Sequence, residues 1–170
     1  EGVKVLDLGQ IYNGPYAGFL LAHAGADVVK VEPLSGEILR ERGGGEVPLS
    51  FAMLNTNKRG ITINLKESKG RELLLNLAGE ADVLLENFAP EAMDRLGLGL
   101  DLFLKNNPRL IYASGSGYGL TGPNKDNLAM DLTVQAVGGI MSINGPEKGP
   151  PMKAGAAICD FVGGVHLYAG

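Results

Sequence analysis

Short apolar runs alternate with helix-like runs along most of this chain, and no other feature constrains its fold as strongly. The apolar runs cover residues 3–9, 27–32, 61–65, 82–88 and 109–114. The helix-like runs cover residues 17–24, 67–80, 90–96, 101–107 and 127–137. Strands that alternate with helices predict an α/β fold: a Rossmann-like, doubly wound, mostly parallel sheet with helices on both faces.

The first two strands and the helix between them form a unit of about 30 residues, the usual length of a parallel crossover. Gly9, Gly14 and Gly18 in this unit lack the G-x-G-x-x-G spacing of dinucleotide-binding folds. Glu32 ends the second strand, where NAD enzymes carry an acid that binds ribose. Because the glycine spacing is wrong, NAD binding is the disfavoured interpretation.

Composition excludes several classes of protein. The 170 residues are 45% hydrophobic and 20% charged, which is ordinary for one globular domain. A net charge of −4 gives no general basic field for nucleic acid, and no apolar run is long enough to cross a membrane. The one cysteine, Cys159, fits a reducing compartment. We therefore expect a cytoplasmic protein without nucleic-acid or membrane partners.

Two further segments have features that ligand sites often show. Residues 33–48 form a polar segment that is long for a structureless loop and contains three successive glycines. Positive charge lies at both ends of the strand at 61–65, on Lys58, Arg59 and Lys66, where it can meet phosphates. A solvated sheet edge explains the same charges and is the favoured interpretation. The sequence contains no metal-ligand cluster, so we expect no metal.

One carboxylate near the C-terminal end is a candidate nucleophile. Residues 154–159 are small and apolar, which predicts a short buried strand, and a helix-like run follows Asp160 directly. The amides and dipole at a helix start stabilise negative charge, so we expect Asp160 to be ionised at neutral pH. Gly163 and Gly164 leave room beside it for a ligand. The commoner role of such an acid is a helix N-cap, and these residues alone favour the cap.

Several motifs occur in an order and spacing that resemble one family. They are VLDL at 5–8, GP at 14–15, GADVVKVE at 25–32, NKR at 57–59, ADVLLENF at 81–88, RLG at 95–97, SGSGYGLTGP at 114–123, QAVGG at 135–139 and the stretch around Asp160. Together they make the chain similar, over essentially its whole length, to the N-terminal part of class III CoA-transferases. That superfamily includes formyl-CoA and carnitine CoA-transferases and the α-methylacyl-CoA racemases.

The resemblance implies a coenzyme A site on a large Rossmann-like domain. Carried over by position, the CoA contacts are Tyr12, Asn13, Ile63, Asn64, Leu65, Lys66, Asn87, Phe88 and Arg95. Lys66 and Arg95 would pair with phosphate, and Phe88 would meet the adenine or the pantetheine arm. The placement of these residues at strand ends agrees with the general rule for ligand sites in open α/β sheets.

The resemblance also implies covalent chemistry on Asp160, which matches the family's catalytic aspartate and moves its interpretation from cap to nucleophile. Asp160 would attack an acyl-CoA thioester to give a mixed anhydride, and then an aspartyl-CoA thioester that the acceptor acid attacks. The substrates would be an acyl-CoA and a carboxylic acid. Asp131 and Gln135 are candidate residues of the acyl pocket, and a solvated helix face is an equally good interpretation of both.

Two features depart from the family pattern. Family members are much longer, so residues 1–170 are expected to be the N-terminal portion of the large CoA-binding domain, without the small domain and the returning C-terminal segment. Family dimers are interlocked, and we expect a homodimer of simpler geometry here. Racemases carry a histidine before the acid that matches Asp131, where this chain has Met130. A transferase is favoured, with a racemase-like enzyme or a truncated, non-catalytic CoA-binding or assembly module as alternatives.

Overall fold

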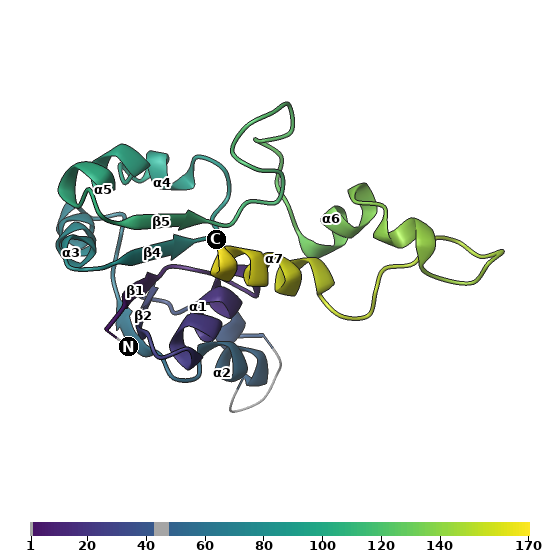
Figure 1. Cartoon of the computed structure of the whole chain (residues 1–170), viewed down its shortest axis with the longest axis horizontal. Helices are drawn as coiled ribbons and strands as arrows, with labels where there is room; N and C mark the ends of the chain where they lie inside the picture. The colour runs from purple at the N-terminus through teal and green to yellow at the C-terminus, as the bar shows by residue number, and fades with distance from the viewer. Residues whose placement is uncertain (1, 43–47) are drawn as a thin grey trace.

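The computed structural model of this chain describes residues 2–42 and 48–170 (Figure 1). The predicted polar loop at 33–48 is therefore described only in part, and its three glycines at 43–45 lie outside the described residues. In the described part of that loop, a single 3-10 turn, η1, spans Ile38–Arg40.

A parallel sheet forms the centre of the molecule. Across the described residues it has five strands in the order β3-β2-β1-β4-β5. Their bounds are β1 Lys4–Asp7, β2 Asp27–Glu32, β3 Arg59–Thr62, β4 Val83–Glu86 and β5 Ile111–Ser114. Every pairing is parallel, and Val5 of β1 lies between Val28 of β2 and Val83 of β4. The chain winds outward from β1 to both edges, which confirms the predicted doubly wound α/β fold.

Helices connect the strands and cover both faces of the sheet. Their bounds are α1 Asn13–His23, α2 Leu49–Asn55, α3 Ser68–Gly79, α4 Ala92–Arg95, α5 Leu100–Asn106, α6 Asp131–Val137 and α7 Ile158–Ala169, with a second 3-10 turn, η2, at Ile140–Ile143. Helix α6 begins later than the predicted run at 127–137. The Thr133 hydroxyl accepts the Met130 N–H at 2.9 Å, which satisfies a backbone donor at the start of the helix.

The alternation of side chains along β1 builds one core on each face of the sheet. Leu6 and Leu8 belong to a cluster with Leu74 of α3 and Phe103 of α5. Val5 belongs to the opposite cluster, which includes Val28 and Leu85 of the sheet and Ala22 of α1. Figure 1 shows the same division, with α3 and α5 grouped apart from α1 and α2. These two clusters bury both sheet faces, as a parallel sheet requires.

Beyond β5 the chain leaves the sheet and returns as α7. Figure 1 shows α6 and the loops around it projecting away from the strands, and α7 lying along α1. The ring of Phe161 meets that of Tyr16 edge-on, with centroids 4.9 Å apart. A side chain on Gly164 would place its Cβ 2.7 Å from the Asn13 carbonyl oxygen, so glycine is what allows this close helix packing.

The predicted buried strand at 154–159 is wrong. Residues 154–157 have no regular structure and are exposed or half-buried, and α7 already begins at Ile158. This segment lies on the projecting part of the chain, away from the edge of the sheet, so it has no strand to pair with. Its small side chains also bury little apolar area, which leaves no energetic reason for a strand there.

The solvated-edge interpretation of the basic residues near β3 is wrong for Lys58. Its ammonium donates to the Asp7 carboxylate at 2.7 Å and to the Pro15 carbonyl at 2.8 Å, and its side chain is 1% exposed. Burial lowers the pKa of Lys58, and the charge of Asp7 opposes that effect. Arg59 does lie on the surface, where it pairs with Asp27 at 2.6 Å. Lys58 and Arg59 therefore both form ion pairs with carboxylates of the same chain.

Glu32 also forms an ion pair within the chain, which argues against a ribose-binding role. Its carboxylate accepts both Nε and Nη2 of Arg40, at 2.6 and 2.8 Å, and Glu32 is 4% exposed. In the described ranges no helix is long and apolar enough to span a membrane. The same residues contain no group of three or more side chains suited to hold a metal ion.

Candidate active site

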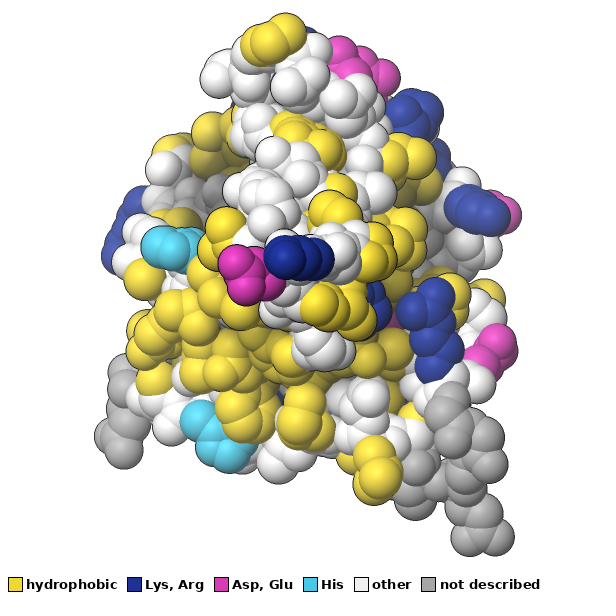
Figure 2. All heavy atoms as spheres, turned by 90° about the vertical axis from the view of Figure 1, so that its right-hand side faces the viewer, with side chains coloured by type: hydrophobic (Ala, Val, Ile, Leu, Met, Phe, Trp, Pro, Cys, Tyr) yellow, Lys and Arg dark blue, Asp and Glu magenta, His cyan; other side chains and the backbone are white. Residues whose placement is uncertain are grey.

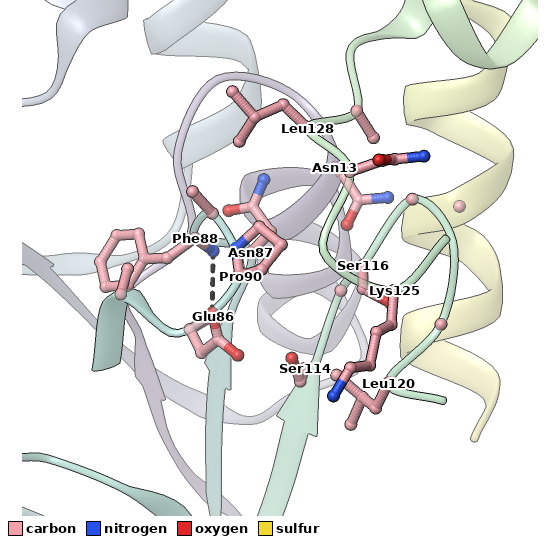
Figure 3. Close-up of a pocket in the computed structure, with 18 of the residues that line it drawn as sticks. Asn13, Glu86, Asn87, Phe88, Pro90, Ser114, Ser116, Leu120, Lys125 and Leu128 are labelled. Atoms are coloured by element: carbon pink, nitrogen blue, oxygen red, sulfur yellow. Dashed lines mark hydrogen bonds between the residues drawn. The ribbon is translucent and has the colours of Figure 1, made fainter. Parts of the chain in front are cut away.

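A cavity of about 900 Å³ opens beyond the carboxyl ends of β4 and β5. Its walls come from the start of α1, the segment after β4, the loop after β5, and the facing sides of α6 and α7 (Figure 3). The predicted site residues among its lining are Asn13, Asn87, Phe88, Asp131 and Asp160. Residues that are far apart in sequence thus meet at the sheet edge where open α/β folds bind ligands.

Asp160 lies in the first turn of α7 and faces this cavity. Burial, reinforced by the nearby charge of Asp131, raises the pKa of Asp160 from 3.8 to about 6. No hydrogen bond within the described chain stabilises its charged form. A carboxyl group with this pKa is still ionised in about nine molecules of ten at pH 7. Ionisation of Asp160 at neutral pH stays a prediction, and its pKa moves in the opposite direction to the one a helix start alone favours.

The cap of α7 is supplied by Asp131. Its Oδ1 accepts the Cys159 N–H at 2.9 Å, one of the free amides at the start of the helix. The N-cap position of α7 belongs to Ala157, which offers no side-chain acceptor. The interpretation of Asp160 as the helix N-cap is therefore wrong, because a carboxylate from α6 satisfies that end of α7 and leaves Asp160 without this task.

Gln135, one turn further along α6, holds the Asp131 carboxylate in place. Its Nε2 donates to Asp131 Oδ2 at 2.7 Å, and its Oε1 accepts the Ala154 N–H at 2.7 Å. Gln135 is fully buried and is not part of the cavity lining, whereas Asp131 is. Of the two candidate acyl-pocket residues, the structure brings Asp131 to the cavity and gives Gln135 a supporting position. Neither is a solvated helix face at this point.

Asn13 lies between α1 and α7 at the edge of the cavity. Its Nδ2 donates to the Asp160 carbonyl at 3.4 Å, and its Oδ1 is buried without a partner in the described chain. A Cβ on Gly115 would lie 2.5 Å from that oxygen, so glycine is needed beside it. A buried acceptor without a donor is costly, and a ligand that donates an N–H would relieve it.

Asn87 braces the loop between β1 and α1. Its Oδ1 accepts the Gln10 N–H at 2.6 Å, and its Nδ2 donates to the Gln10 carbonyl at 3.0 Å. The next residue, Phe88, donates its N–H to Glu86 at 2.8 Å, as the dashed line in Figure 3 shows. These bonds give the segment after β4 a fixed shape at the mouth of the cavity.

A second, smaller cavity of about 310 Å³ lies next to the first and shares Phe88 with it. The predicted CoA contacts Ile63, Asn64, Leu65 and Lys66 line it, and the apolar side chains of Leu8, Val31 and Leu96 complete its walls. Seven of the nine residues that the resemblance assigned to CoA therefore line two adjoining cavities.

Tyr12 and Arg95 line neither cavity. The Tyr12 ring packs against Phe161, with centroids 5.6 Å apart. Arg95 is exposed and lies 3.7 Å from Glu91, on the short helix whose Ala92 and Leu96 contact the smaller cavity. The geometry of the two cavities therefore does not support their predicted roles as CoA contacts. Each is adjacent in sequence to a lining residue, Asn13 for Tyr12 and Leu96 for Arg95.

Sequence reasoning missed the buried polar residues that shape the site, above all Asp7 and Glu37. Asp7 is fully buried, with its Oδ1 accepting the Gly9 N–H at 2.8 Å at the start of the loop. Glu37 is 3% exposed and lines the smaller cavity. A signal existed for Asp7 and for Lys30, since a charge inside an apolar strand run must find a partner. Glu37 carried no such signal in its polar segment.

The fold and the site together define an α/β protein with a half-buried carboxylate, unpaired within the described residues, at the carboxyl edge of a parallel sheet. The chain belongs to CoA-transferase family III, whose family model matches residues 1–170. This confirms the resemblance seen in the sequence.

Curated relatives and a solved structure agree with this assignment. A formyl-CoA:oxalate CoA-transferase of Streptomyces avermitilis is 47% identical over 173 residues, covering 100% of this chain and 42% of the relative. A human succinyl-CoA:glutarate CoA-transferase is 38% identical, covering 99% of this chain and 39% of the relative. A CAIB/BAIF family protein from Brucella suis superposes with a TM-score of 0.95 at 37% identity, covering 99% of this chain and 47% of that protein. The chain thus spans less than half the length of these proteins.

Proposed function

We propose that this chain carries the nucleophile of an enzyme that moves CoA between an acyl-CoA thioester and a carboxylic acid. One observation supports this most directly. Asp160 is a half-buried carboxylate that faces a cavity of about 900 Å³ and has no stabilising partner in the described chain. A desolvated carboxylate without hydrogen bonds is a better nucleophile than a solvated one, and no structural task occupies it.

The proposed reaction begins when an Asp160 oxygen attacks the thioester carbonyl carbon of the donor. The C–S bond breaks, CoA leaves as a thiolate, and a mixed anhydride forms. The thiolate then attacks the Asp160 acyl carbon and releases the donor acid as a carboxylate. This leaves Asp160 as a thioester of CoA. Each step conserves charge, because one anion is consumed and one is released.

The acceptor acid reverses this sequence. Its carboxylate attacks the Asp160 thioester, which gives a new anhydride and frees the CoA thiolate. Attack of the thiolate on the acceptor carbonyl forms the product acyl-CoA and restores the Asp160 carboxylate. Oxyanions develop at every attack, and backbone amides of the glycine-rich loop at 115–119, which lines the cavity in part, are suitable donors.

The two cavities offer a path for the CoA molecule. We propose that the nucleotide end occupies the region of the smaller cavity, where Lys66 is exposed and can pair with phosphate. The pantetheine arm would pass Phe88, which borders both cavities, and would place the thioester near Asp160. The unpartnered Oδ1 of Asn13 would accept an amide N–H of that arm. Arg95 and Tyr12 would contribute from the rim.

Apolar side chains on the outer face of α7 support a homodimer. Ile158, Val162, Val165 and Tyr168 recur at helical spacing and are 39–49% exposed. Figure 2 shows a broad apolar band on the side of the molecule that lies to the right in Figure 1. Such a band is large for a free surface, which favours burial against a second subunit. We propose a cytoplasmic homodimer in which residues 1–170 are the N-terminal portion of the large domain.

An exchange assay with labelled CoA tests the proposed reaction. Asp160→Asn keeps the shape of the side chain but cannot form the anhydride, so exchange should fall by orders of magnitude. Asp126→Asn is the matched control, since Asp126 lines the same cavity and is exposed. Equal exchange in Asp160→Asn and in the wild-type chain would refute the proposal.

The same assay separates the enzyme from a non-catalytic CoA-binding module. Because the chain spans 42% of its Streptomyces avermitilis relative, a module that only binds is a distinct alternative. Titration calorimetry with CoA that shows heat, together with no exchange in the wild-type chain, would favour the module. Exchange that depends on Asp160 would favour the transferase.

A further inference from the structure

The loop that leads into α1 contains a residue in an unusual backbone conformation. Ile11 has φ of 62°, in the left-handed region that β-branched residues rarely adopt. Nothing in a chain of ordinary residues holds an isoleucine there by preference, so surrounding contacts must impose it. Such conformations cluster at functional sites, and Ile11 is followed directly by Tyr12 and Asn13.

Two side chains impose this conformation, one buried (Glu37) and one half-buried (Asn87). Glu37 Oε1 accepts the Ile11 N–H at 2.9 Å, and Glu37 is 3% exposed. Asn87 fixes the preceding residue, Gln10, through both its N–H and its carbonyl. Ile11 therefore lies directly after a clamped residue, and its own N–H is held by a carboxylate from outside the loop.

Glu37 is itself held in place, so it can act as a rigid anchor. Its N–H donates to the Glu32 carboxylate at 2.9 Å, and Glu32 is fixed by the bidentate pair with Arg40. Its Oε1 also accepts the Leu39 N–H at 3.3 Å, which fixes the side chain against the 3-10 turn. The position of the Ile11 N–H is thus determined by the end of β2 and the turn after it.

The residues after Ile11 make the contacts that join α1 to the start of α7. The Tyr12 ring packs on Phe161, and the Asn13 amide donates to the Asp160 carbonyl at 3.4 Å. A rotation of the backbone at Ile11 would move both residues relative to Asp160. The conformation of Ile11 is therefore coupled to the geometry of the cavity.

We propose that Glu37 is a positioning residue: it holds Ile11 in the left-handed conformation and thereby places Tyr12 and Asn13 against Asp160 and Phe161. Its effect on CoA exchange rests on the proposed function, whereas its effect on the loop does not. The rival role is direct contact with a ligand, because Glu37 lines the smaller cavity and its Oε2 is buried without a partner in the described chain.

Suppression by glycine distinguishes the two roles. Glu37→Ala removes the acceptor of the Ile11 N–H, and an isoleucine at position 11 should then relax out of the left-handed region. Glycine adopts that region readily, so Glu37→Ala combined with Ile11→Gly should keep the native loop. The matched control pairs Glu37→Ala with Asn57→Gly, since Asn57 has φ of 64° and lies outside both cavity linings.

The first readout needs no activity. In the 15N-labelled chain without ligand, we expect Glu37→Ala to shift the amide signals of Asn13 and Phe161. Adding Ile11→Gly should return these signals to their wild-type positions, and Asn57→Gly should not. Glu37→Gln keeps an acceptor oxygen and should leave them unchanged. If Glu37→Ala fails to fold, Glu37→Asp withdraws the oxygen by one methylene and takes its place in the same series.

The second readout is CoA exchange. Since a misplacement of about 1 Å in an active site can lower rates by about a hundredfold, we expect Glu37→Ala to reduce kcat by about tenfold to a hundredfold and Ile11→Gly to restore most of it. Unshifted amide signals in Glu37→Ala, or no rescue by Ile11→Gly, would overturn the positioning role. A third outcome separates the two proposals. If Ile11→Gly rescues the amide signals of Glu37→Ala but the wild-type chain shows no CoA exchange, the positioning role is supported and the proposed function is not.

Discussion

At the scale of single residues, the environment of Asp160 explains why one carboxylate among several at the cavity is suited to covalent chemistry. Asp131 is occupied by the Cys159 N–H and by Gln135, and Glu86 accepts the Phe88 N–H. Asp160 has no comparable partner in the part of the chain that the structure describes, and burial raises its pKa to about 6. The group is thus ionised near neutral pH and poorly stabilised, a combination that favours attack on a carbonyl carbon.

The raised pKa of Asp160 predicts how exchange depends on pH. Only the ionised carboxylate is nucleophilic, so kcat/KM for exchange should fall by about tenfold per pH unit below the pKa. We expect the break in the pH profile near pH 6, the pKa of Asp160. A profile that stays flat down to the ordinary aspartate pKa of 3.8 would contradict this assignment.

The same shift predicts a pH-dependent gain in stability for Asp160→Asn. Because the folded-state pKa lies above the ordinary value of 3.8, the folded chain binds the proton more tightly, and stability falls as pH rises from 3.8 to about 6. Asparagine removes this penalty. After allowance for the exposed part of the side chain, the gain at pH 8 is on the order of 1 kcal/mol, and it should vanish near pH 4. Thermal unfolding at both pH values measures it, and a gain independent of pH would argue against a buried charge.

At the scale of elements, the position of α7 depends on contacts made by other helices. Asp131 of α6 caps its first turn, and glycines at its interface with α1 let the two backbones approach. These contacts join residues far apart in sequence, which is why the pattern around Asp160 predicted a strand and an N-cap that the structure does not have. The helix itself, and the glycines beside Asp160, were visible in the sequence.

Removal of the Asp131 carboxylate, which caps α7 from α6, should destabilise α7. Asp131→Ala leaves the Cys159 N–H without its acceptor, and we expect a loss of about 0.5–2 kcal/mol in the free energy of unfolding. It also removes a nearby negative charge, so the pKa of Asp160 should fall below about 6. Denaturant unfolding measures the first effect and a pH profile the second. Asp126→Ala, a change in an exposed acid of the adjoining loop, should produce neither.

Gly164 provides a test of the α1–α7 interface in which the sign of the effect is decisive. Alanine in place of a helical glycine normally stabilises by about 1 kcal/mol. At Gly164, however, the added Cβ would lie 2.7 Å from the backbone carbonyl oxygen of Asn13, so Gly164→Ala should destabilise the chain. Gly155→Ala is the control, because no heavy atom of the described residues lies within 4 Å of its added Cβ. A melting temperature raised by Gly164→Ala would contradict the packing described.

At the scale of the whole molecule, a buried charge pair joins the centre of the sheet to the segment before β3. Lys58 reaches Asp7 from beyond α2, with both side chains at or below 1% exposure. Removing Lys58 leaves Asp7 with Lys30, 4.0 Å away, as its one buried cation among the described residues. Lys58→Met should therefore cost up to about 3–5 kcal/mol. The neighbouring exposed pair is the control, since Arg59→Met should cost at most about 1 kcal/mol. Similar losses for both variants in denaturant unfolding would contradict the buried pairing.

The sequence predicted what depends on local pattern and left out what depends on distant partners. The first five strand runs, their parallel arrangement and the helices at 67–80 and 101–107 follow from apolar spacing. The structure has each of them, with β3 at Arg59–Thr62 beginning two residues before the run predicted at 61–65. The sequence predicted Lys58 as a surface cation, and Gln135 as either a pocket residue or part of a solvated helix face. The fold instead places Asp7 beside Lys58 and Ala154 beside Gln135, and both side chains are buried. The predicted CoA-contact positions came from family resemblance rather than from spacing, and the sequence did not indicate that they line two separate cavities.

Chemical trapping of the covalent intermediate tests the central claim most directly. The protein is incubated with an acyl-CoA and then with hydroxylamine, which converts an activated carboxyl group to a hydroxamate, and the modified peptide is mapped by mass spectrometry. We predict a hydroxamate on Asp160, dependent on acyl-CoA and absent from Asp160→Asn. Modification of a different carboxylate, with Asp160→Asn still modified and still active in exchange, would contradict the assignment of Asp160 as the nucleophile.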